Sequence, residues 1–210
     1  MIHYVDNFLP QDQFEALKNR VDSRFGTGRG NDLQPNTDEP CRVTWHDSSG
    51  DWEEALNFFG HECRPAIEKM IVSLEQDMGA KDLKNWSVWF QYIISSMTLP
   101  AHKDANLRKS SEEHTYTAII YTSDWQPGWG GEFIVGEPIW NPEVSAKAIG
   151  LKNLTHTIDP IPNRMLIWSR DEWHAVQKVT NSDPNYIRSF FASGWSSIDV
   201  QQAKGEFYDL

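Results

Sequence analysis

The feature that most constrains the fold is a change in the spacing of apolar residues near Trp86. From 86 to 94, apolar and aromatic side chains recur at every second position, and a strand places such side chains on one face. Further β-prone runs follow, separated by turn residues, at 115–122, 132–135, 155–158, 165–168, 173–179 and 186–195. Many short strands after a helical N-terminal third predict a β-sandwich backed by helices.

The first third of the chain has helical spacing instead. After a short strand expected at 2–8, residues 11–25 repeat apolar side chains every three to four positions: Phe14, Leu17, Val21 and Phe25. Helical patterns recur at 51–59 and in a segment that begins near Pro65, a residue that suits a first helical turn. We expect these apolar stripes to pack against the sheet.

No repeat, low-complexity tract or linker interrupts the chain, so we expect a single domain, 1–210. Within it, helical support would occupy about 1–84 and the strand-rich core about 85–197. Residues 26–40 are rich in Gly, Asn, Asp and Pro, which predicts a loop, either a binding lid or a disordered segment. The segment 139–159 is longer than a minimal connection and is a candidate to shape a substrate site.

Composition excludes several classes of partner. The net charge of −11 and the absence of a long basic run disfavour nucleic acid, because phosphate binding needs clustered Lys and Arg. Cys41 and Cys63 have no metal-site spacing and indicate reduced thiols, with a single disulfide as the alternative. No signal peptide or membrane span is evident. We therefore expect a soluble, cytoplasmic protein that does not bind membranes, and the sequence predicts no oligomeric state.

His102 and Asp104 are the first candidates for chemistry. They stand two positions apart after Pro100, so in an extended segment both side chains leave the same face. An imidazole and a carboxylate so placed are two of the three ligands of the 2-His-1-carboxylate triad that holds non-haem Fe(II). His174, on a later strand, is the candidate third ligand. The alternatives are a surface His–Asp pair and, for His174, an ordinary core histidine.

Arg188 lies inside an otherwise apolar strand. A buried arginine without an anion is costly, and guanidinium binds carboxylates through two hydrogen bonds. A dicarboxylate cosubstrate would satisfy it, whereas a structural pair with an internal Asp or Glu is the alternative. The Gly-Gly-Glu turn after Trp129 is interpreted as structural, with Trp129 itself a candidate to line a substrate entrance.

Taken in order, these motifs resemble the Fe(II)- and 2-oxoglutarate-dependent oxygenases, and most closely their prolyl 4-hydroxylase-like branch. The resemblance covers most of the chain, through Tyr-Val-Asp-Asn-Phe-Leu-Pro at 4–10, His-Lys-Asp at 102–104, Thr-Ala-Ile-Ile-Tyr at 117–121, Gly-Gly-Glu-Phe at 130–133, Asn-Arg-Met-Leu-Ile-Trp at 163–168, His-Ala-Val at 174–176, and Arg188. It implies an α+β, mainly β fold, a distorted double-stranded β-helix (jelly roll) with N-terminal helices packed on one sheet.

The resemblance also implies roles for individual residues. His102, Asp104 and His174 would be the catalytic ligands of Fe(II), and Arg188 would bind the C5 carboxylate of 2-oxoglutarate. Tyr92 would hydrogen-bond the same cosubstrate, although the glycine-rich turn usual in the prolyl branch is missing after it. Dioxygen would be the second cosubstrate and ascorbate a candidate further reductant.

Four hypotheses about function follow. The first is hydroxylation of a peptidyl residue, with proline as the leading substrate. The second is the same chemistry on a free amino acid or small metabolite, and the third is a non-catalytic jelly-roll protein with a vestigial metal site. A nucleic-acid demethylase of the same superfamily is disfavoured by the acidic charge.

Overall fold

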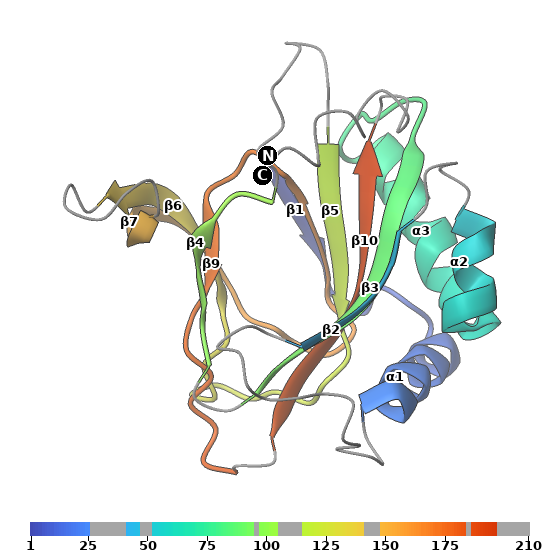
Figure 1. The fold of residues 1–210 in the computed structure, drawn as a ribbon, viewed down its shortest axis with the longest axis horizontal. Helices are drawn as coiled ribbons and strands as arrows, with labels where there is room; N and C mark the ends of the chain where they lie inside the picture. The colour runs from blue at the N-terminus through green and yellow to red at the C-terminus, as the bar shows by residue number, and fades with distance from the viewer. Residues whose placement is uncertain are drawn as a thin grey trace.

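The computed structural model of the protein shows two antiparallel β-sheets facing each other, with helices on the outer face of the larger one (Figure 1). It describes residues 1–25, 41–46, 52–94, 97–104, 115–140, 148–183 and 186–196. The predicted loop at 26–40 lies outside these residues. No helix in the described part of the chain has the length and apolarity needed to cross a membrane.

The larger sheet has six strands in the order β1-β8-β5-β10-β3-β2, and every neighbouring pair is antiparallel. Its strands are β1 (Ile2–Val5), β2 (Cys41–His46), β3 (Lys84–Ile94), β5 (Thr115–Tyr121), β8 (Met165–Ser169) and β10 (Ile187–Ser196). Both edge strands come from the N-terminal part of the chain, which was expected to supply helical support. Sequence spacing predicted β1 but missed β2.

The smaller sheet has four strands in the order β4-β9-β6-β7. They are β4 (Leu99–His102), β6 (Phe133–Trp140), β7 (Ala148–Ile158) and β9 (His174–Val176). The antiparallel pair β6–β7 extends away from the larger sheet in Figure 1. The segment expected to be a long connection after residue 139 is therefore mainly strand β7.

The predicted helices are present as α1 (Gln11–Phe25), α2 (Trp52–Phe59) and α3 (Arg64–Gln76), with a short 3-10 helix (η1, His61–Cys63) between the last two. Their apolar faces are buried against the larger sheet, as the spacing predicted. Phe59 of α2, for example, is fully buried and packs edge-to-face on Phe90 of β3 at 4.6 Å between ring centroids. Burial of each such side chain contributes about 1.5–3 kcal/mol, so this layer anchors the larger sheet.

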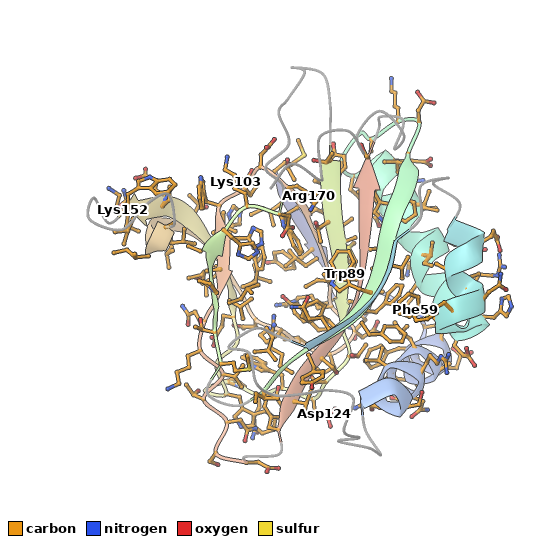
Figure 2. All side chains as sticks on the ribbon, viewed as in Figure 1. Phe59, Trp89, Lys103, Asp124, Lys152 and Arg170 are labelled. Carbon is orange, nitrogen blue, oxygen red and sulfur yellow. The ribbon has the colours of Figure 1, made fainter. Side chains whose placement is uncertain are left out.

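Strand β3 separates the two cores of the protein. Val88 and Phe90 face the helices, whereas Trp89 and Ile93 face the smaller sheet. The alternation in the sequence predicted that these two sets lie on opposite faces, but not which core each face meets. Figure 2 shows Trp89 on the inner side of the larger sheet and Phe59 on its helix side. The space between the two sheets is thus lined by one face of each strand, and the candidate functional residues lie there.

Candidate metal centre and active site

The structure brings His102, Asp104 and His174 together. Strand β4 pairs with β9 so that His102 lies directly opposite His174, and Asp104 follows two residues later. Oδ1 of Asp104 lies 3.5 Å from Nε2 of His102 and 3.4 Å from Nε2 of His174. Among the described residues, these three are the one group of His, Cys, Asp or Glu side chains whose candidate ligand atoms lie close enough to hold a metal ion, within 4.8 Å of one another.

Both imidazoles are oriented by main-chain carbonyl groups. Nδ1 of His102 lies 2.7 Å from the carbonyl oxygen of Pro100, and Nδ1 of His174 lies 2.9 Å from that of Glu172. A carbonyl only accepts, so each Nδ1 carries a hydrogen, and in the neutral imidazole each Nε2 then keeps a lone pair. Both lone pairs belong to the nitrogens that approach Asp104. Neutral imidazoles in this tautomer are suited to bind a divalent metal.

Asp104 is held as a carboxylate. Burial alone would raise its pKa, but the electrostatic influence of His174, His102 and the nearby Arg170 holds the pKa of Asp104 well below its ordinary value. Its second oxygen, Oδ2, accepts hydrogen bonds from Thr117 and Trp168. The site therefore offers one anionic and two neutral ligands, a donor set that suits Fe(II) and leaves positions open.

Arg188 lies in the same space between the sheets. Its side chain is 1 % exposed, and its guanidinium carbon lies 4.9 Å from the ring centroid of Tyr121 and 5.5 Å from that of Phe190. Nε and Nη1 of Arg188 and the hydroxyl of Tyr121 are buried without a hydrogen-bond partner. Glu132 is near enough to act electrostatically on Arg188, but it does not hydrogen-bond Nε or Nη1. Buried polar groups are normally paired, so the three atoms indicate the place of an anionic ligand.

Burial shifts the pKa of both groups toward the uncharged form: it lowers the pKa of Arg188 and raises the pKa of Tyr121. Gly131 makes room for the arginine. It has φ +81°, and a Cβ there would lie 2.8 Å from Cδ of Arg188. The Gly-Gly-Glu turn is therefore structural, as expected, and its second glycine is adjacent to the candidate anion site.

Tyr92 is not brought to this site. It packs with the cluster on the helix side of β3, because it lies an even number of residues from Val88 and Phe90 and therefore on the same face of the strand. The tyrosine that accompanies Arg188 is Tyr121 of β5. The sequence contained part of the signal, since Thr117 and Tyr121 share one face of a predicted strand. That this face turns toward the site is shown only by the structure, in which Thr117 contacts Asp104. Trp129 packs edge-to-face on Tyr186 and does not line the cavity.

A single cavity connects the two halves of the site. The three candidate ligands and Arg188 all line it. Its other walls are mainly apolar and aromatic, with two further polar side chains, and consist of Trp89, Gln91, Leu99, Thr117, Ile119, Phe133, Trp168, Val176 and Phe190. A small molecule here could contact a metal with one end and a guanidinium with the other.

Comparison with known families agrees with this geometry. The sequence model of the 2OG-Fe(II) oxygenase superfamily matches residues 88–196, which include all three candidate ligands and Arg188. The chain belongs to this superfamily. A 2OG-Fe(II) oxygenase is a dioxygenase that uses Fe(II) and 2-oxoglutarate, and the donor set and the unpaired guanidinium fit both groups. No curated relative matches the chain by sequence.

Several solved structures share the fold. A Pseudomonas putida prolyl-4-hydroxylase superposes with a TM-score of 0.57 at 17% identity, covering 93% of this chain and 91% of the other. The viral collagen prolyl hydroxylase of Paramecium Bursaria Chlorella virus-1, solved with 2OG, gives 0.57 at 12% identity, with 94% and 96% covered. HygX from Streptomyces hygroscopicus, solved with nickel and 2-oxoglutarate, gives 0.61 at 12% identity, with 92% and 81% covered.

Proposed function

We propose that this oxygenase hydroxylates a peptidyl residue, with proline as the leading substrate. We also propose that Fe(II) and 2-oxoglutarate bind in the cavity between the two sheets. His102 and His174 would hold Fe(II) through Nε2, and Asp104 would hold it through Oδ1. Arg188 and Tyr121 would bind the C5 carboxylate of 2-oxoglutarate. The observation that carries the proposal is the buried guanidinium of Arg188, whose Nε and Nη1 have no hydrogen-bond partner, in the cavity that the three ligands line.

Bound Fe(II) supplies the activation of dioxygen that couples decarboxylation of 2-oxoglutarate to hydroxylation of the substrate. The chain contributes position and charge. Arg188 can donate two parallel hydrogen bonds to a carboxylate, which fixes the orientation of the diacid, and the Tyr121 hydroxyl can donate a third. Because Arg188 and Tyr121 are buried beside mainly apolar walls, charge-assisted hydrogen bonds there are stronger than they are in water.

We interpret the two facing sheets as the distorted double-stranded β-helix that the resemblance implies, in one domain that includes the N-terminal helices. Two features support this interpretation. The sheets are antiparallel throughout, and the helices share one core with the larger sheet. Removal of the helices would expose that core, so we propose that they support the sheet from behind.

Two substrate classes are compatible with the site. A peptide is favoured because the structural neighbours include several prolyl hydroxylases, one solved with a hypoxia inducible factor peptide fragment from Trichoplax adhaerens. That protein superposes with a TM-score of 0.57 at 14% identity, covering 97% of this chain and 86% of the other. The same chemistry on a free amino acid or small metabolite is the alternative, and the mainly apolar walls of the cavity are compatible with it.

The test is an incubation of Fe(II)-loaded protein with 2-oxoglutarate and two panels, proline-containing peptides and free amino acids. Succinate release and a gain of one oxygen in the substrate mass are both measured. We expect substrate-dependent succinate with the wild-type protein and none with His174→Ala or Asp104→Ala. Normal turnover after loss of His174 would exclude the proposed triad. Metal binding without any succinate, over both panels, would instead favour a non-catalytic metal-binding protein.

A further inference from the structure

The Asp104 carboxylate is restrained from one side by two neighbouring strands. Thr117 of β5 donates to Oδ2 through its hydroxyl at 2.7 Å, and Trp168 of β8 donates to the same oxygen through Nε1 at 2.9 Å. Arg170, just after β8, donates to the main-chain oxygen of Asp104. The side chain and the backbone of this residue are thus both tethered to the larger sheet, although the two histidines belong to the smaller one.

These hydrogen bonds give the two carboxylate oxygens of Asp104 different surroundings. Oδ1 faces Nε2 of both histidines at 3.5 and 3.4 Å, whereas Oδ2 is engaged by two donors on the opposite side. A free carboxylate can bind a metal through one oxygen or both. Binding through both would require Oδ2 to leave Thr117 and Trp168, and it would occupy one of the positions that the 2-His-1-carboxylate site keeps open.

We propose that Thr117 and Trp168 are positioning residues that hold Asp104 so that it ligates Fe(II) through Oδ1 alone. The inference rests on the proposed function, since it requires the three residues to bind the metal. It adds two residues of the larger sheet to the site and assigns them an effect on the geometry of the metal. Neither residue needs to touch the metal to have this effect.

The two donors differ in what they permit. A hydroxyl can donate or accept a hydrogen bond, whereas the indole Nε1–H only donates. Trp168 therefore needs a hydrogen-bond acceptor, such as an oxygen, at the Oδ2 position. Its ring is also fixed by packing, since its centroid lies 4.8 Å from that of Phe133 and 5.2 Å from that of His174. Trp168 is thus the stricter determinant of the orientation.

This asymmetry gives a prediction for Asp104→Asn. The amide oxygen should turn toward Trp168, and the amide nitrogen, which cannot ligate, should then face the histidines. Asp104→Asn should therefore lose metal affinity although it still carries an oxygen. A second change, Trp168→Phe, should free the amide to turn its oxygen to the metal while its nitrogen donates to Thr117.

The experiment is a Co(II) titration of the full chain, followed by the visible absorption of the bound ion. Thr117→Val and Trp168→Phe remove one donor each, and Thr117→Ser is the matched control that keeps the hydroxyl. We expect the Kd for Co(II) to rise about tenfold or more in the first two variants, with altered absorption bands, and to stay near wild type in the third. Melting temperatures, measured alongside, identify any variant that has lost its fold.

A second comparison does not depend on loss of affinity. Asp104→Asn with Trp168→Phe should bind Co(II) more tightly than Asp104→Asn alone, and damage to the fold cannot produce a gain. The inference is overturned if folded Thr117→Val and Trp168→Phe both bind Co(II) within twofold of wild type, or if the double variant shows no gain. If the wild-type protein itself binds no Co(II), the proposed metal site is overturned as well.

Discussion

Replacement of Arg188 by methionine should make the ligand-free protein more stable while it destroys binding of 2-oxoglutarate. The reason is that Arg188 is 1 % exposed and neither Nε nor Nη1 has a hydrogen-bond partner. A buried charge of this kind is unfavourable until a carboxylate meets it. Methionine fills much of the same volume without the charge.

The magnitude follows from the surroundings of the guanidinium. An uncompensated buried charge costs about 3–5 kcal/mol. Its contacts with the rings of Tyr121 and Phe190, together with the field of Glu132, offset about 2 kcal/mol of that cost. The net gain on removal is therefore about 2 kcal/mol, which for a chain of this size raises the Tm by about 4–8 °C. The loss of two charge-assisted hydrogen bonds should weaken 2-oxoglutarate binding by about a hundredfold or more.

The assay is thermal unfolding with and without 2-oxoglutarate, in the presence of Mn(II), together with calorimetric titration of the cosubstrate. Arg164→Met is the matched control, because Arg164 is also a buried arginine but is paired with Asp6 by two hydrogen bonds. It should lower the Tm and leave the Kd for 2-oxoglutarate unchanged. At a concentration of 2-oxoglutarate about a hundred times the wild-type Kd, ligand binding adds about 2.7 kcal/mol to the wild type, so the order of stability between wild type and Arg188→Met should reverse.

Two results would refute this reasoning. One is an Arg188→Met protein that is less stable than wild type without ligand, which would mean that the guanidinium already has a stabilising partner. The other is an unchanged Kd for 2-oxoglutarate, which would mean that the cosubstrate carboxylate binds elsewhere.

Three further predictions test other parts of the structure. Gly131→Ala should raise the Kd for 2-oxoglutarate about tenfold, because the new Cβ would lie 2.8 Å from Cδ of Arg188 and φ is +81°; titration of folded protein checks this, and an unchanged Kd contradicts it. The hydrogen bonds from Arg164 lower the pKa of Asp6, so Asp6→Asn should cost up to about 1 kcal/mol at pH 7. The difference should shrink once the pH falls below the ordinary value of 3.8 and vanish below the lowered pKa of the folded state. Urea unfolding at pH 7 and pH 3 measures it, and an equal difference at both pH values would be inconsistent with it. Burial raises the pKa of Cys63 to about 12, so in a Cys41→Ser background a thiolate reagent at pH 8 should modify Cys63 only after unfolding, and equal rates in folded and unfolded protein would contradict this.

The order of elements was accessible from sequence because most of them have one apolar face. The period of three to four in α1 and the period of two in β3 each specify what is buried, and both predictions are confirmed. Strand β2 was missed because it follows a glycine- and asparagine-rich run and its identity depends on pairing with β3. Pairing of this kind is a tertiary property.

The candidate site could be predicted from those residues whose side chains are rarely buried without a ligand or a charged partner. A histidine and a carboxylate two apart, a distant histidine and an arginine in an apolar strand each need something to bind, and the fold brings them together. The tyrosine was misplaced because spacing along the chain does not fix which face of β3 turns inward. The packing of Val88 and Phe90 on the helices decides which face turns inward. The tyrosine beside Arg188 is therefore Tyr121, on strand β5, which pairs with β10.

The most direct test of the account is a crystal structure of the protein grown without oxygen in the presence of Mn(II) and 2-oxoglutarate. The account predicts one metal ion bound by Nε2 of His102, Oδ1 of Asp104 and Nε2 of His174, with the far carboxylate of the diacid on the guanidinium of Arg188. A metal ion bound elsewhere, or a diacid whose carboxylates both avoid Arg188, would contradict it.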